Sequence, residues 1–144
     1  MLQEIEAAPR GFGFFVWLSI VLGAIGILGN TVLLVLSIAH GSASEVSLLA
    51  PAWLSALQIT ADSLQVYSGI QVRRHVDWAR KALIALASIS LVELLYNTGS
   101  LLQSQRLVLS PTTTSYFLIP LCIHSSIFYY FSRRAVKDFV RGAR

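Results

Sequence analysis

Two acids and a histidine inside apolar segments carry the most chemical potential in this chain. Asp62, Glu93 and His124 each fall near the middle of a run of largely hydrophobic residues. An ionisable side chain is costly in an apolar medium, so each of them should face away from lipid and have a partner. Together they could bind a proton or a cation. One histidine with two carboxylates also resembles some metal ligand sets, but no spacing such as His-x-x-x-His supports a metal, and we expect none.

Polar and small residues accompany these groups at regular intervals. In three of the apolar runs they recur every three or four residues, which places them along one stripe of a helix. A mean period of 3.5 residues is typical of left-handed helix packing, so we expect these stripes, here called polar seams, to face one another. The seams consist of Ser19, Gly23, Gly26 and Asn30 in the first run, Ser55, Gln58, Asp62, Gln65 and Gly69 in the second, and Ser90, Glu93, Asn97, Ser100 and Ser104 in the third.

The depth of each ionisable group follows from its distance to the middle of its run. With a rise of about 1.5 Å per residue, Asp62, Glu93 and His124 fall within about 5 Å of one depth. Hydrogen bonding between helices would explain the amides and serines of the seams, whereas two acids exceed what packing requires and favour a binding site. The residues of this candidate intramembrane polar site are Asp62, Glu93, His124, Asn97, Gln58, Gln65 and Asn30.

Membrane-spanning helices are the elements that would position these residues. Of the 144 residues, 55% are hydrophobic and only 12% are charged, whereas a soluble domain carries about a quarter charged residues. A helix needs about 20 mostly apolar residues to cross a bilayer, and the runs are too long and too irregular in alternation for strands. The sequence predicts an all-α fold, a four-helix transmembrane bundle forming one integral membrane domain over 1–144, with spans at 12–38, 48–72, 82–102 and 115–131.

The distribution of basic residues predicts the orientation of these spans. Lys and Arg accumulate in cytoplasmic loops, and here they gather in a loop at 73–81 and a tail at 132–144, leaving Arg106 alone on the opposite side. Both termini should therefore be cytoplasmic. We expect the basic loop and tail to contact anionic lipid and not nucleic acid, because topology alone accounts for two short juxtamembrane clusters. The first span should be retained, since its flank is not basic as that of a secretory signal is.

No motif indicates an enzyme or a cofactor. The chain has no nucleophile elbow, phosphate-binding loop or dinucleotide fingerprint, and its single cysteine, Cys122, excludes an intrachain disulfide. We therefore expect a binding or assembly subunit of a membrane complex or of a homo-oligomer. One alternative is a minimal proton- or cation-coupled transporter or channel that uses Asp62 and Glu93. The other is a membrane enzyme on a lipophilic substrate, with one carboxyl group as general acid or base.

The C-terminal segment from Tyr129 to Val140 reads Tyr-Tyr-Phe-Ser-Arg-Arg-Ala-Val-Lys-Asp-Phe-Val. It resembles the signature of an uncharacterised family of small four-span bacterial inner-membrane proteins, which end in Tyr-Phe, a Ser/Arg pair, Arg-Val-Lys and a final Phe. The Arg-Val-Lys element is one residue longer here, and the Gly-Gly-Trp that opens family members is only faintly echoed by Gly11, Gly13 and Trp17. The resemblance implies a bacterial inner-membrane location and no site residues.

Overall fold

The computed structural model describes residues 8–40, 52–103 and 111–142 of the chain. This part is helical apart from short turns and contains no strand, so the predicted all-α class is confirmed. Residues 48–51 of the second predicted span, Ser104, Arg106 and the last two residues of the basic tail lie outside it. The helices are α1 (Phe12–His40), α2 (Ala52–Arg73), α3 (Asp77–Gln103), α4 (Pro111–Ser132) and α5 (Arg134–Gly142).

The observed helices begin and end close to the predicted spans, with one marked difference. α3 begins at Asp77, before the predicted start at residue 82, and so includes part of the basic loop. An acid in the first turn of a helix is favourable because it faces unpaired backbone N–H groups. The preceding turn is tight, since His75 adopts a left-handed backbone conformation with φ of 56°. Hydropathy identifies the residue at which α3 becomes apolar, and that residue comes after the one at which the helix begins.

Two of the described helices are long and apolar enough to cross a membrane. They are α1 over Phe12–Ala39 and α3 over Asp77–Gly99, while α4 contributes a shorter apolar stretch, Phe117–Ser132. Only 11% of the most apolar window of each long helix is buried in the molecule. A core helix of a soluble domain would be mostly buried, so these two helices are candidate membrane spans by their length, composition and exposure.

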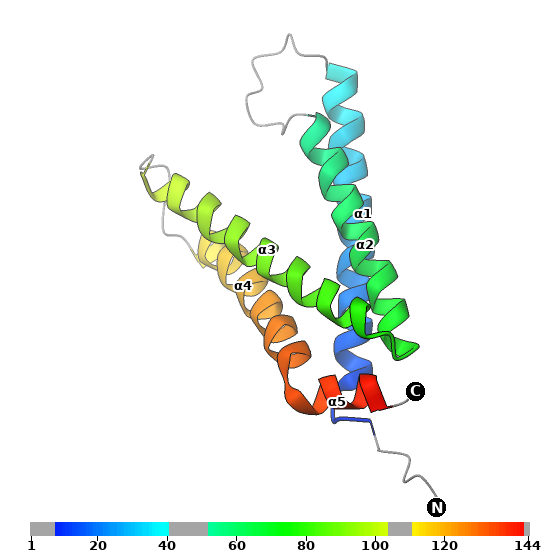
Figure 1. The fold of residues 1–144 in the computed structure, drawn as a ribbon. Coiled ribbons are helices and arrows are strands. Elements are labelled where there is room, and N and C mark those ends of the chain that lie inside the picture. The colour runs from blue at the N-terminus through cyan, green and yellow to red at the C-terminus, as the bar shows by residue number, and fades with distance from the viewer. Residues whose placement is uncertain (1–7, 41–51, 104–110, 143–144) are drawn as a thin grey trace, which may run out of the picture.

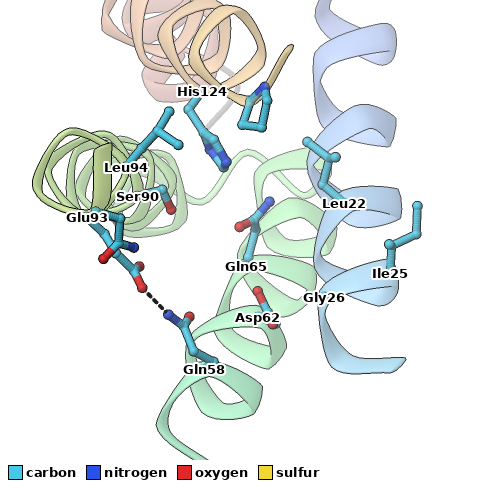
Figure 2. Close-up of a pocket in the computed structure, with 12 residues that line it drawn as sticks. Leu22, Ile25, Gly26, Gln58, Asp62, Gln65, Ser90, Glu93, Leu94 and His124 are labelled. Atoms are coloured by element: carbon cyan, nitrogen blue, oxygen red, sulfur yellow. Dashed lines mark hydrogen bonds between the residues drawn. The ribbon is translucent and has the colours of Figure 1, made fainter. Parts of the chain in front are cut away.

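The four long helices form two antiparallel hairpins that meet at one end and diverge toward the other (Figure 1). α1 packs along α2, and α3 packs along α4, whereas contact between the hairpins runs mainly through α2 and α3. Further along, α2 and α3 face each other across a cleft (Figure 2). The arrangement therefore has a joined end, where the hairpins and α5 meet, and a wide end.

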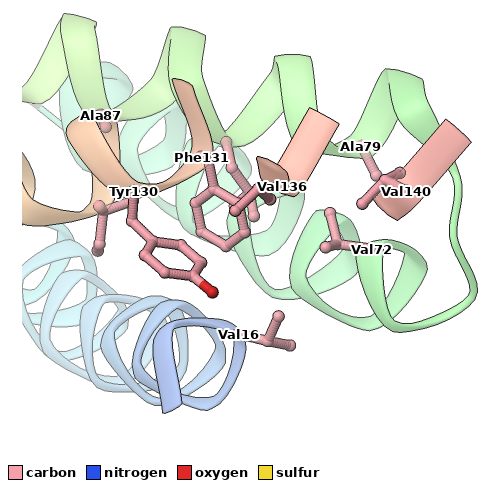
Figure 3. Close-up of a cluster of buried hydrophobic side chains, with 10 residues drawn as sticks. Val16, Val72, Ala79, Ala87, Tyr130, Phe131, Val136 and Val140 are labelled. Carbon is pink, nitrogen blue, oxygen red and sulfur yellow. The ribbon is translucent and has the colours of Figure 1, made fainter. Parts of the chain in front are cut away.

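The buried hydrophobic core lies at the joined end (Figure 3). Val16 of α1, Val72 of α2 and Phe131 of α4 are fully buried there. The short helix α5 closes this core with Val136 and Val140, which are 1% and 0% exposed. Apolar residues that interrupt the charges of the predicted basic tail therefore pack against the chain itself.

Aromatic contacts and ion pairs surround this core. The ring of Phe139 lies 5.1 Å from that of Phe12 and 4.8 Å from that of His75. Asp77 is paired with Arg80 and Arg141, each at 3.1 Å. The Nη1 atom of the buried Arg80 also donates a hydrogen bond of 2.9 Å to the backbone carbonyl of Phe131. Because a buried charge needs such partners, this network fixes the second hairpin to α5 at the joined end.

Candidate functional site

The polar seams of α1 and α2 pack directly against each other. Gly23 permits a close approach, since a Cβ atom at this position would lie 2.8 Å from the backbone carbonyl oxygen of Asp62 and 2.8 Å from Val66 Cγ2. One turn further toward the joined end, Gln65 Nε2 donates a hydrogen bond of 3.1 Å to the backbone carbonyl of Ser19. The small residues of the first seam thus bring the two backbones together, as small residues do between membrane helices.

Asp62 occupies a space that Gly26 leaves open. A Cβ atom at Gly26 would stand 2.5 Å from Oδ2 and 2.6 Å from Oδ1 of this carboxyl group. Asn30 Nδ2 donates a hydrogen bond of 2.9 Å to Asp62 Oδ2 and another of 3.0 Å to the carbonyl of Gly26. Glycine and asparagine of α1 therefore set the position of an acid that belongs to α2.

Glu93 links the two hairpins. Gln58 Nε2 of α2 donates a hydrogen bond of 2.8 Å to Glu93 Oε1 of α3 (Figure 2). Each acid thus accepts a hydrogen bond from a side-chain amide, at one of its two oxygens in either case. An ionised carboxylate has about four acceptor positions, so these bonds leave capacity for a ligand.

A cleft of about 340 Å³ lies between the hairpins and contains both acids. α4 supplies His124 and α1 supplies Leu22 and Gly26 (Figure 2). Pro120 of α4 and Ile25 of α1 complete the contribution of these two helices. The cleft is within the size range of small-molecule sites, about 300 to 1,000 Å³. The remaining lining residues are Gln58, Asp62, Gln65, Ser90, Glu93, Leu94 and Asn97.

The charge of the cleft is acidic. Among the residues that line it there are two carboxyl groups, one histidine and no lysine or arginine. The three ionisable side chains are Asp62, Glu93 and His124. With no permanent positive charge in its lining, the cleft would attract cations rather than anions when its carboxyl groups are ionised.

The three ionisable groups do not converge on one point. Within the described residues, no group of three His, Cys, Asp or Glu side chains is placed to hold a metal ion. Asp62 stands on the first hairpin beside α1, while Glu93 and His124 belong to the second hairpin (Figure 2). The acids therefore face the cleft from separate walls.

The structure brings together six of the seven residues that the sequence marks as a candidate site. Gln58, Asp62, Gln65, Glu93, Asn97 and His124 line the cleft, and Asn30 lies behind Asp62, which it contacts. Sequence reasoning missed the aliphatic lining residues Leu22, Ile25 and Leu94. They carry no signal in the sequence because a leucine facing a cleft and one facing lipid look the same.

Comparison with protein-family models, curated proteins and solved structures found no match to this chain. The resemblance of residues 129–140 to small bacterial inner-membrane proteins therefore stays an expectation.

Proposed function

We propose that this chain is a four-span membrane protein that binds a small cation in the cleft between its two helical hairpins. The observation that carries the proposal is that Asp62 and Glu93, from different hairpins, line one cleft without lysine or arginine among its lining residues. Polar seams that served only to hold helices together would pack without space between them. A cleft with two acids costs folding free energy that binding a cation offsets.

The dimensions of the helices support four crossings. α2 and α4 have 22 residues each, which corresponds to about 33 Å of helix against a hydrocarbon core of about 30 Å. α2 is the less apolar because it carries a full polar seam. That seam faces α1 and the cleft, so it does not oppose insertion as lipid-facing polar groups would.

The position of the basic residues supports an orientation with both termini in the cytoplasm. The basic loop and the basic tail meet at the joined end, where Arg141 of α5 and Lys81 of α3 both pair with Asp77. Two segments that obey the positive-inside rule must lie on the same side of the membrane. The cleft would then widen away from the cytoplasm. A bacterial inner membrane is suggested by the resemblance alone.

Cation transport is a second candidate, favoured by hairpins that meet at one end only. A ligand in the cleft would contact both hairpins, so its binding could change the angle between them. The wide end offers it a route in and out.

Titration calorimetry on the protein in lipid nanodiscs tests the proposed binding. The probes are the chlorides of sodium, magnesium and hexylammonium. At least one cation should bind the wild type, and the double variant Asp62→Asn, Glu93→Gln should bind it roughly tenfold or more weakly, because charge-assisted hydrogen bonds are lost.

The matched control is Asp138→Asn, which removes an acid from α5 that pairs with Arg134 at an exposed position and does not line the cleft. It should bind like the wild type. Absence of binding by all three cations, or unchanged binding in the double variant, would contradict the proposed function.

A further inference from the structure

Each wall of the cleft combines an acid with apolar side chains. On the first hairpin, Leu22 of α1 lines the cleft beside Asp62 (Figure 2). On the second, Leu94 follows Glu93 directly in α3, and Pro120 lies on α4. Apolar walls do not contribute to binding of a bare inorganic ion. Sites for small organic molecules, in contrast, are mostly apolar, with a few polar groups that orient the ligand.

The carboxyl groups are poorly arranged for a bare inorganic ion. Magnesium takes six oxygen ligands and calcium six to eight, at short distances and from converging groups. Here Asn30 and Gln58 each engage an acid through an N–H group, and amide nitrogens do not bind metal cations. A ligand with its own N–H donors, however, fits the free acceptor positions of a carboxylate.

The structure also leaves more space than an ion requires. A volume of about 340 Å³ is roughly ten times the share of one water molecule in the liquid. Filling it with a hydrocarbon body would remove apolar surface from water and would add contacts with both walls.

We propose that the ligand is an amphiphilic ammonium ion, that is, a protonated amine with a hydrocarbon body. Its ammonium group binds the Asp62 carboxylate within the field of Glu93, and its body lies between apolar residues of the two walls, Leu22 and Leu94 among them. This inference rests on the proposed function and names the class of cation that the site selects.

The test compares probes that differ in one property each. Hexylammonium has charge and a hydrocarbon body, hexan-1-ol has the body alone, and sodium and magnesium have charge alone. In nanodiscs, hexylammonium should bind at least tenfold more tightly than the other three. Asp62→Asn should weaken it by roughly ten- to hundredfold through the loss of a charge-assisted interaction.

The apolar contribution has its own matched pair of variants. Leu94→Ala removes side-chain surface from the cleft and should weaken hexylammonium binding by about tenfold. Leu95→Ala removes the same atoms from the next residue, which is 58% exposed and does not line the cleft, and it should change nothing. If Asp62→Asn does not accumulate in the membrane, Glu93→Gln replaces it as the charge variant.

The outcomes separate this inference from the proposed function. Binding of sodium or magnesium that depends on Asp62, without preferential hexylammonium binding, overturns the ammonium inference and leaves the proposed function in place. Equal binding of hexan-1-ol and hexylammonium, or equal effects of Leu94→Ala and Leu95→Ala, also overturns the inference. If no cation binds, both proposals fail.

Discussion

At Gly26 and Gly23, one turn apart on α1, an added Cβ atom would meet different parts of α2. At Gly26 it would meet the Asp62 side chain, 2.5 Å from the carboxyl carbon, and at Gly23 it would meet the Asp62 backbone carbonyl at 2.8 Å. A side-chain end can rotate away, whereas a backbone can move only with its helix. Gly26 therefore positions a functional group, and Gly23 sets the distance between the two helices.

The variant Gly26→Ala should separate these roles. We expect it to displace the Asp62 carboxyl group from Asn30 and to weaken cation binding by about tenfold, while the midpoint of thermal unfolding in detergent changes little. Calorimetry and a thermal scan measure the two quantities. Gly29→Ala is the control, because a Cβ atom at Gly29 has no neighbour within 4 Å, and both quantities should stay at wild-type values.

Wild-type affinity in Gly26→Ala would show that the position of the Asp62 carboxyl group does not matter for binding. Gly23→Ala should behave in the opposite way to Gly26→Ala and lower the unfolding midpoint, since α1 and α2 would have to separate.

Among the elements, α5 shows how a short basic segment becomes part of the fold. Its Val136 and Val140 enter the core at the joined end, and its Arg141 pairs with Asp77 of α3. An isolated helix of this length is unstable in water, so tertiary contacts must hold it. The buried valines contribute most of this stability, because an exposed ion pair contributes at most about 1 kcal/mol.

Substitution of neighbouring residues on α5 tests this assignment. Val136→Asp places a charge in the core and should lower the free energy of unfolding by about 3 kcal/mol. Ala135→Asp, at an exposed position of the same helix, should change it by no more than about 0.5 kcal/mol. Chemical denaturation in detergent gives both values, and similar effects of the two variants would place the valine face of α5 outside the core.

The elements also show what the sequence could and could not predict. The spacing of Gly23 and Gly26 in α1, and of Asp62 and Gln65 in α2, correctly predicted which faces of the two helices pack together. Residues three or four positions apart lie on one face of a helix, so this spacing identifies the face. It could not predict the angle between hairpins, which depends on how side chains fill the joined end. The fold of α5 was also missed, since nine residues rich in charge have the composition of a solvated tail.

The candidate site was predictable for a related reason. Acids and amides in an apolar run are costly unless they have partners, so Asp62, Glu93 and Gln58 were conspicuous. The hydrogen bond between Gln58 and Glu93 could not be predicted, because the two residues are in different helices and nothing in their spacing relates them. Gly26 was recognised as a seam residue, but its role appears only when the Asp62 carboxyl group is seen beside it.

At the scale of the whole molecule, basic and acidic side chains lie at different positions along the length of the helices. Basic side chains from α2, α3 and α5 surround the joined end, and the acids of the cleft lie between that end and the wide end. Exposed aromatic side chains accompany the basic ones, as Arg73 lies 5.3 Å from the ring centre of Trp17. Lys and Arg accumulate in cytoplasmic loops and tryptophan at both membrane interfaces, so with the proposed orientation we expect anionic lipid at this end.

This charge distribution predicts the result of topology mapping. In a Cys122→Ser background, a cysteine at Ser132, an exposed residue at the end of α4, should react with a membrane-impermeant maleimide only after the cytoplasmic side is opened. A cysteine at Ser42, which lies outside the described residues, should react from the opposite side of intact cells. Labelling with the reverse pattern would overturn the proposed orientation.

Because the hydrophobic core holds the two hairpins together only at the joined end, a rotation there would move their far ends apart or together. The part of α1 from Val16 at the pivot to Ile38 at the tip is about 33 Å long, and the Gln58–Glu93 hydrogen bond spans the gap between pivot and tips. A rotation of roughly 10° at the pivot would therefore move a tip by about 6 Å. If the proposed ligand draws Asp62 and Glu93 together, a small closure of the cleft would become a larger displacement of the helix tips.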